Sequence, residues 1–170
     1  MLGFLFPRLT PAAERGAEAF NAVTAIARRP AFYRAGAVPD TIDGRFALLT
    51  TVLALMLVRI EREGEAGNPL SVAVTERFIA AMEAEHRELG LGDPTLGKTV
   101  RKLVGALARR VDRWRTAISS GGDWTEAVRA SLYQGNPEPC AVTCAAAQLR
   151  TIWSMFADAD LTQIAKGDLE

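Results

Sequence analysis

The sequence predicts an all-α protein: a single-domain bundle of about six helices around one central apolar helix at residues 43–62. Between Arg45 and Arg59 every residue is apolar except two threonines, so a helix here must be covered on all sides. Residues 96–118 place apolar side chains every three or four positions, which is typical of an amphipathic helix. No segment shows the two-residue alternation that predicts a strand.

Length and composition agree with a globular domain. A chain of 170 residues is typical of one domain, and its two cysteines are too few for a disulfide framework. Its 20 basic and 20 acidic residues cancel, so net charge gives no reason to expect direct nucleic-acid binding. The central apolar run falls short of the roughly 20 residues that cross a bilayer. We expect a helical domain at residues 10–160, between an apolar arm (1–9) and a C-terminal tail (161–170).

The N-terminal arm carries three apolar residues, Phe4, Leu5 and Phe6, but has neither a secretory signal nor the character of a transit peptide. These side chains could contact a membrane surface, or they could fold back onto the domain. We therefore expect a cytoplasmic protein and leave open a peripheral contact with the inner membrane.

The first two long helices are delimited by their caps. Thr10 and Pro11 suit the N-cap and first position of a helix that ends at residues 28–30, where a proline stops it. A connector over residues 31–44 then leads to Asp43, which is expected to be the N-cap of the central helix.

The third helix is expected from Asn68 to Leu89, with Gly90 after it as a stop. Glu85 falls in the middle of its apolar stripe and His86 at the edge of that stripe. A buried carboxylate needs a partner, and a lone histidine is more often an edge residue than a ligand. We therefore expect Glu85 to be solvated or paired with an arginine.

The longest helix should begin at Asp93 and carry the apolar stripe of residues 96–118 on one side. Its opposite side gathers cations within about a quarter of the helix circumference, at about 100° per residue. Such a face can be balanced by acidic neighbours, or it can bind a partner. This basic ridge consists of Lys98, Lys102, Arg109 and Arg113, with Arg101 beside it.

Two further helices complete the predicted bundle. Asp123 and Glu126 resemble an acidic capping box for a helix that Gly135 closes, and a last long helix follows Pro139. Cys144 is expected on the apolar side of that last helix, one turn after Cys140. This spacing could hold a metal or redox pair, although small cysteines on an alanine-rich helix are more often packing residues. After residue 157 we expect a frayed short helix and a tail.

Motifs for catalysis and for cofactors are nearly absent. A single histidine excludes a multi-histidine metal site and makes any Ser-His-Asp mechanism depend on His86, which has no evident nucleophile beside it. The segment GDPTLGKT at residues 92–99 spells a phosphate loop, but no strand precedes it and its pattern is already helical. We expect no enzyme, no bound cofactor and no metal.

Two separate motifs resemble the ubiquinol-cytochrome c chaperone family. Residues 37–49, AVPDTIDGRFALL, are similar to its VPDT-DGRF signature, and residues 87–102 are similar to its GVGD-VGK-VRK signature, in the same order and separation. The chain departs from that pattern where Val52 replaces a more usual histidine and where His86 replaces an apolar residue. Its N-terminus is as short as in bacterial members.

The resemblance implies a non-enzymatic assembly factor of the cytochrome bc1 complex. Mitochondrial members of that family bind newly made cytochrome b, act with a small partner protein and associate with the ribosome. On this reading the client-facing surface lies where the connector meets the basic helix, although Asp43 and Asp93 also suit helix caps. The residues expected there are Asp40, Asp43, Arg45, Asp93, Lys98, Arg101 and Lys102, with Arg109 and Arg113 continuing the ridge.

A second class of function stays open from the sequence. Helix bundles also form sites for small apolar molecules between their helices. A lipid, quinone or haem could lie between the central helix and Trp114 or Trp153.

Overall fold

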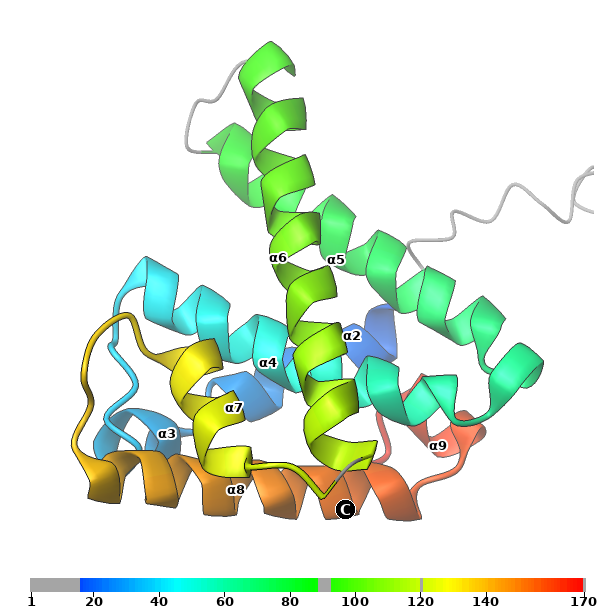
Figure 1. Cartoon of the computed structure of the whole chain (residues 1–170). Coiled ribbons are helices and arrows are strands. Elements are labelled where there is room, and N and C mark those ends of the chain that lie inside the picture. The colour runs from blue at the N-terminus through cyan, green and yellow to red at the C-terminus, as the bar shows by residue number, and fades with distance from the viewer. Residues whose placement is uncertain (1–15, 89–92, 120, 170) are drawn as a thin grey trace, which may run out of the picture.

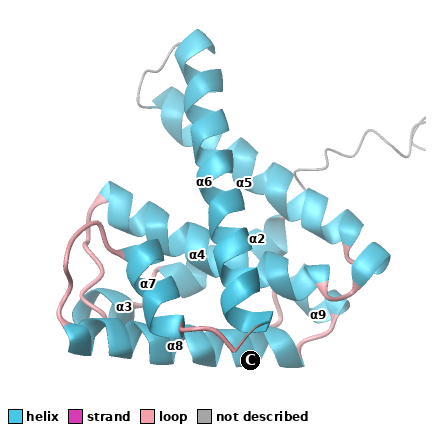
Figure 2. Cartoon of the chain, viewed as in Figure 1, coloured by secondary structure: helices cyan, strands magenta, loops and turns pink. Residues whose placement is uncertain are grey.

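The computed structural model describes residues 16–88, 93–119 and 121–169, apart from the side chains of residues 93–96. Over these ranges the chain forms helices α2 to α9 and a short 3-10 turn, η1, at Gly64–Ala66. Figure 2 shows helices and loops but no strand in this part of the chain. The predicted all-α class is therefore confirmed. None of the described helices combines the length and apolar character that crossing a membrane requires.

Helix α4 (Ile42–Glu61) forms the centre of the bundle. Every residue from Thr50 to Ile60 is buried, as the uniformly apolar sequence predicts. The two threonines are accommodated because their hydroxyls donate to carbonyl oxygens one turn back, Thr50 to Phe46 at 2.7 Å and Thr51 to Ala47 at 2.7 Å. The helices that contact α4 are α2 (Ala17–Ala27), α5 (Asn68–Glu88), α6 (Asp93–Ser119), α7 (Trp124–Leu132) and α8 (Pro139–Asp158).

Figure 1 shows how these helices are arranged. Helix α8 runs along the base of the view, α4 crosses the middle, and α6 crosses α4 steeply. The first half of α6 and the last turns of α5 rise together above the rest of the bundle, and we call this projection the α5–α6 hairpin. Val100 is buried within the hairpin but lies outside the main hydrophobic core, so the projection has its own small apolar contact.

Two short helices add to the six that the sequence predicts. Helix α3 (Pro30–Arg34) lies inside the predicted connector. Helix α9 (Leu161–Lys166) lies where a frayed short helix was expected, and it is firmly capped and packed, because Asp160 and Gln163 form a reciprocal capping box and Ile164 is fully buried. It contacts α2, so this segment forms part of the bundle. A helix of five or six residues is too short to show a hydrophobic period, which explains the difference from the sequence-based expectation.

Arg59 connects the end of the central helix to this C-terminal region. Its side chain is almost fully buried, pairs with Glu63 at 2.6 Å and donates from Nη2 to the carbonyl oxygen of Ala159 at 2.8 Å. Both contacts satisfy a guanidinium that would otherwise be costly to bury. The arginine therefore fixes the junction between α8 and α9 against α4.

The last long helix departs from the prediction at one position. Ala141, Leu149 and Phe156 are buried as expected, but Cys144 is exposed, as is Cys140. On a helix this rich in alanine the two faces differ little in hydrophobicity, so periodicity fixes the buried arc poorly. The caps expected at Thr10 and Pro11, the arm at residues 1–9, and the stop at residues 89–90 lie outside the described residues.

Candidate functional site

The connector before α4 is held by close backbone packing. Val38 is buried, and Gly44 lies so close to Pro39 that a Cβ at this glycine would be 1.9 Å from the Pro39 carbonyl oxygen. The N-cap of α4 is Thr41, whose Oγ1 accepts a hydrogen bond from the amide of Gly44 at 3.1 Å. The sequence-based assignment of the cap to Asp43 is therefore wrong, because the Pro39–Gly44 contact starts the helix earlier.

The side chains of Asp40, Thr41, Ile42, Asp43 and Arg45, around the start of α4, are exposed. Arg45 donates from Nε to Asp40 Oδ1 at 2.6 Å, and this hydrogen bond holds the pKa of the Asp40 carboxyl below its usual value. Asp43 is exposed in the first turn of α4, where its charge suits the positive end of the helix dipole. Ile42 is 77% exposed. Together these residues form a polar surface around one exposed apolar side chain, which we call the connector surface.

Sequence reasoning missed Ile42 as a candidate for partner binding. Its position on the helical wheel is shared with Leu49 and Leu53, so periodicity predicts that it is buried. Instead, Ile42, Asp43 and Arg45 are exposed in the first turn of α4, where Gly44 alone of residues 42–45 is buried. The feature of the sequence that could have indicated its exposure is its position directly after a capping residue, at the end of the helix.

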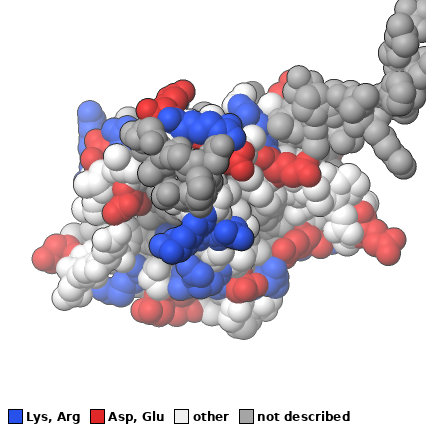
Figure 3. Space-filling view, turned by 90° about the horizontal axis from the view of Figure 1, so that it is seen from above, with Lys and Arg blue, Asp and Glu red and all other residues white. Residues whose placement is uncertain are grey.

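The basic ridge lies along the outer face of α6. Lys98, Arg101, Lys102 and Arg109 are exposed, and none of them forms an ion pair with any residue that the structure describes. Seen from above, Figure 3 shows Lys and Arg side chains on this face of the molecule, with Asp and Glu side chains next to some of them. Four of the ridge cations are thus available to an anionic partner. The side chain of Asp93, which the sequence also assigns to the site, lies outside the described part.

Arg113 differs from the rest of the ridge. It is half-buried, and its Nη1 lies 3.5 Å from the hydroxyl of Ser131 on α7. Its neighbour Arg110, which sequence reasoning left out, also turns to α7 and donates to the Ser131 carbonyl oxygen at 3.1 Å. The lower end of the ridge is therefore partly covered by α7.

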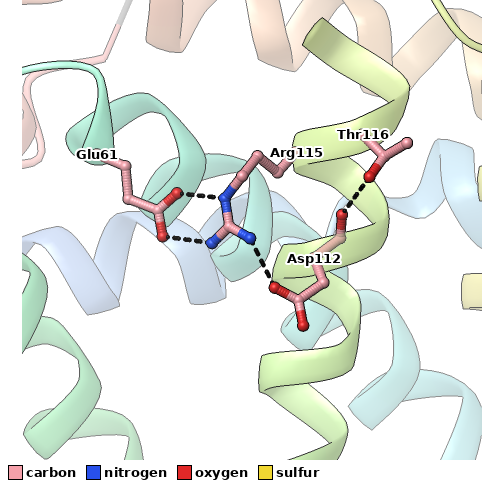
Figure 4. A network of polar contacts seen from close by, with 4 residues as sticks. All are labelled: Glu61, Asp112, Arg115 and Thr116. Atoms are coloured by element: carbon pink, nitrogen blue, oxygen red, sulfur yellow. Dashed lines mark hydrogen bonds and ion pairs between the residues drawn. The ribbon is translucent and has the colours of Figure 1, made fainter. Parts of the chain in front are cut away.

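A network of charges holds the base of the hairpin against α4. Arg115 donates through Nε and Nη2 to the two carboxylate oxygens of Glu61, each at 2.9 Å, and through Nη1 to Asp112 at 2.6 Å (Figure 4). Because both carboxylates favour the charged guanidinium, the pKa of Arg115 is raised. The fork fixes the orientation of α6 on α4 and also occupies Asp112, the carboxylate nearest the ridge.

No hydrogen bond or ion pair in the described part of the chain links Asp40, Asp43 or Arg45 to the ridge cations. The pair Asp40–Arg45 is direct, whereas Lys98, Arg101 and Lys102 share one helix face without touching a connector residue through polar groups. The two groups therefore form separate polar surfaces at the level of direct contacts. That a single partner covers both of them stays a prediction.

The other polar residues singled out from the sequence lie apart from these surfaces. Glu85 is exposed, and His86 donates from Nδ1 to the carbonyl oxygen of Met82 at 2.8 Å, which is the behaviour of an edge histidine. Cys140 and Cys144 are free thiols. Within the described ranges no group of three His, Cys, Asp or Glu side chains is arranged to hold a metal ion.

The phosphate-loop match at residues 92–99 does not form a loop after a strand. Helix α6 begins at Asp93 and runs through Gly97, Lys98 and Thr99. Its backbone amides are therefore committed to helical hydrogen bonds beyond the first turn, and cannot cradle a phosphate in the manner of that motif.

Two hollows on the surface of the described residues are lined by no residue of the central helix. One, of about 430 Å³, is lined by Met155, Asp158, Ala159, Gln163, Asp168 and Leu169. The other, of about 440 Å³, lies between α6 and α7. Near the tryptophans proposed to flank an apolar ligand, Trp114 packs edge-on against Trp124 at 5.1 Å, and the Arg62 guanidinium lies 4.7 Å from the centre of the Trp153 ring.

Comparisons with known proteins address the fold and the family of the chain. The fold is similar to that in the crystal structure of the Cbp3 homolog from Brucella abortus, with a TM-score of 0.75 and 26% sequence identity. The match covers 100% of this chain and 96% of that chain. A comparison with curated proteins gave no match. The family described as ubiquinol-cytochrome C chaperone matches residues 34–169, which include most of the connector, the hairpin and helices α4 to α9. The chain therefore belongs to the ubiquinol-cytochrome c chaperone family.

Proposed function

We propose that this protein is a non-enzymatic assembly chaperone that binds cytochrome b during biogenesis of the cytochrome bc1 complex. Membership of the chaperone family supports the general role. The observation that carries the assignment of a surface is the row of exposed cations on α6, Lys98, Arg101, Lys102 and Arg109, without carboxylate partners among the described residues.

A cationic helix on a projecting hairpin suits a client that presents acidic groups. Because the hairpin rises above the bundle, a partner can approach α6 without displacing the core helices (Figure 1). Exposed charges of this kind act mainly on the rate of encounter and on specificity. The tighter part of the interface needs an apolar contact, and Ile42 on the connector surface supplies one.

The proposed role places the protein in the cytoplasm and peripheral to the inner membrane, where cytochrome b is inserted. Contact with the lipid surface would involve Phe4, Leu5 and Phe6, which lie outside the described residues. A small assembly partner and the ribosome, both implied by the family resemblance, are further predicted partners.

The test is affinity capture of tagged protein from gently solubilised membranes, scored by recovery of cytochrome b. We expect the triple variant Lys98→Glu, Lys102→Glu, Arg109→Glu to lower recovery at least tenfold, which corresponds to about 1.4 kcal/mol of binding free energy. The matched control is Arg28→Glu, Arg34→Glu, Lys166→Glu, which has the same net charge and alters exposed cations away from the hairpin.

A second variant tests the connector surface independently. Ile42→Asp changes a side chain that is 77% exposed, so the free energy of unfolding should shift by less than about 0.5 kcal/mol while recovery of cytochrome b falls. Equal recovery with the wild-type protein, the hairpin triple variant and its control would refute the assignment of the client to the basic ridge. Absence of cytochrome b from every sample would refute the proposed client.

A further inference from the structure

Three arginines meet at the contact between α6 and the end of α7. Arg110 is half-buried there and donates from Nη2 to the carbonyl oxygen of Ser131 at 3.1 Å and from Nη1 to that of Ala106 at 3.4 Å. Arg113, one turn later, contacts the Ser131 hydroxyl at 3.5 Å, and Arg109 beside them is exposed. Arg110 and Arg113 thus both reach Ser131 of α7, Arg109 is close enough to act on the charge of Arg110, and we call these three residues the arginine cluster.

The positive charge of this cluster has no direct counterpart. None of its members forms an ion pair with a described residue, and the adjacent carboxylate, Asp112, is bound to Arg115. Asp123 and Glu126 line the same hollow as Arg113, but neither forms an ion pair with it. The carbonyl end of α7 offsets only about half a charge. No ion pair within the described residues therefore neutralises these three guanidinium groups directly.

The guanidinium of Arg110 is unfavourably placed for a charged group. Burial lowers its pKa, and the neighbouring Arg113 and Arg109 lower it further. Its Nε is buried and has no hydrogen-bond acceptor among the described residues. A guanidinium in this position stores unfavourable free energy, which a bound anion would relieve.

We infer that Arg109, Arg110 and Arg113 form a binding site for an oxyanion of the phosphate class. Arg109 and Arg113 would contact the anion with their planar donor forks, and Arg110 would add charge from beneath. A phosphate is favoured over a carboxylate because it carries about two charges at neutral pH and three acceptor oxygens, against a single charge for a carboxylate. The inference shares Arg109 with the proposed client surface, but it concerns a ligand that the purified chain binds alone, so its test does not depend on cytochrome b.

The first test compares melting temperatures in sodium phosphate and in sodium chloride at equal ionic strength. At ten times the dissociation constant, phosphate should raise the Tm of the wild-type protein by about 4 °C. In sodium chloride, the Tm of Arg109→Gln should be at least as high as that of wild type, because repulsion between the arginines is relieved. In sodium phosphate, its Tm should be lower than that of wild type. Arg34→Gln, an exposed arginine on α3, is the control and should keep the full phosphate effect.

The second test identifies the source of the phosphate group. Sedimentation with phosphatidylcholine vesicles containing phosphatidic acid is compared with vesicles containing phosphatidylserine at the same mole fraction. Binding to phosphatidic acid alone, lost in Arg109→Gln, would assign the site to a lipid headgroup with a phosphate monoester. Stabilisation by phosphate and pyrophosphate without vesicle binding would assign it to a free phosphate compound.

General stabilisation by phosphate, which is excluded from protein surfaces, would raise the Tm of all variants equally. That result, or an unchanged wild-type Tm, would overturn the inference. Because Arg110 is partly buried, Arg110→Met serves as a further variant that keeps the aliphatic stem. It should fold with a Tm near that of wild type in chloride and lose the response to phosphate.

Discussion

Replacing Gly44 with alanine tests the packing of the connector against the start of α4. The added Cβ would lie 1.9 Å from the carbonyl oxygen of Pro39 and 2.9 Å from its carbonyl carbon. Both are backbone atoms, so no side-chain rotation relieves the clash. The connector must move away from the helix, and the hydrogen bond from the Gly44 amide to Thr41 moves with it.

The size of the effect follows from three contributions. Overpacking a well-packed contact costs about 1–3 kcal/mol, and loss of an N-cap costs about 1 kcal/mol. Alanine gains at most about 1 kcal/mol over glycine in helix propensity. We therefore expect Gly44→Ala to lower the free energy of unfolding by about 1–3 kcal/mol. For a chain of this length, a loss of about 2 kcal/mol corresponds to a fall in Tm of about 4–8 °C.

The same substitution at Gly105, in the middle of α6, is the matched control. The nearest atom to a Cβ there is Arg109 Nη1 at 3.5 Å, an ordinary van der Waals contact. Gly105→Ala should therefore stabilise the protein, by up to about 1 kcal/mol. Urea denaturation followed by circular dichroism measures both variants. A Gly44→Ala protein at least as stable as wild type would refute the reasoning, because the connector would then be free to yield.

Two further predictions concern the C-terminal half of the chain. Tyr133 donates to the carbonyl oxygen of Gly36, and burial, with a smaller effect of nearby Cys144, raises the pKa of its phenol to about 12. Below pH 10 the phenol is neutral in both the folded and the unfolded state, whereas between pH 10 and about 12 it ionises only in the unfolded chain. The free energy of unfolding should therefore fall over this pH range. Tyr133→Phe should reduce that fall when urea denaturation at pH 9 is compared with urea denaturation at pH 11. Ile164 is fully buried in α9, so Ile164→Ala should lower the free energy of unfolding by about 2–5 kcal/mol, as measured by thermal unfolding. Thr162 lies on the exposed side of the same helix, and Thr162→Ala should change that free energy by less than about 0.5 kcal/mol. Similar small losses in both α9 variants would show that this helix contributes little to the fold.

The parts of the fold that sequence reasoning predicted are those fixed by long local patterns. The uniformly apolar run predicts the central position of α4, and the stripe that includes Leu107, Val111 and Trp114 predicts the buried side of α6. The Asp123 cap is also local, since its carboxylate accepts from the amides of Thr125 and Glu126 in the same turn. Each of these features depends on residues that are neighbours along one helix.

The features that were mispredicted depend on contacts between segments. Thr41 and Asp43 are both good caps, and the approach of Pro39 to Gly44 decides between them. Arg113 belongs to the ridge by its position on the helical wheel, but Ser131 on α7 draws it aside. Arg110 could not be assigned to a site from the sequence, because its contact with the Ser131 carbonyl oxygen depends on how α7 packs against α6.

The projection of the α5–α6 hairpin has a consequence for how the protein can change over evolutionary time. Its outer turns pack mainly on each other, with Val100 buried outside the main core, whereas the base is fixed by Arg115 and Glu61. Substitutions on the outer face of these turns therefore carry little penalty for folding. A lineage can alter which partner it recognises there, or extend the two helices by matched turns, while the rest of the bundle keeps its structure.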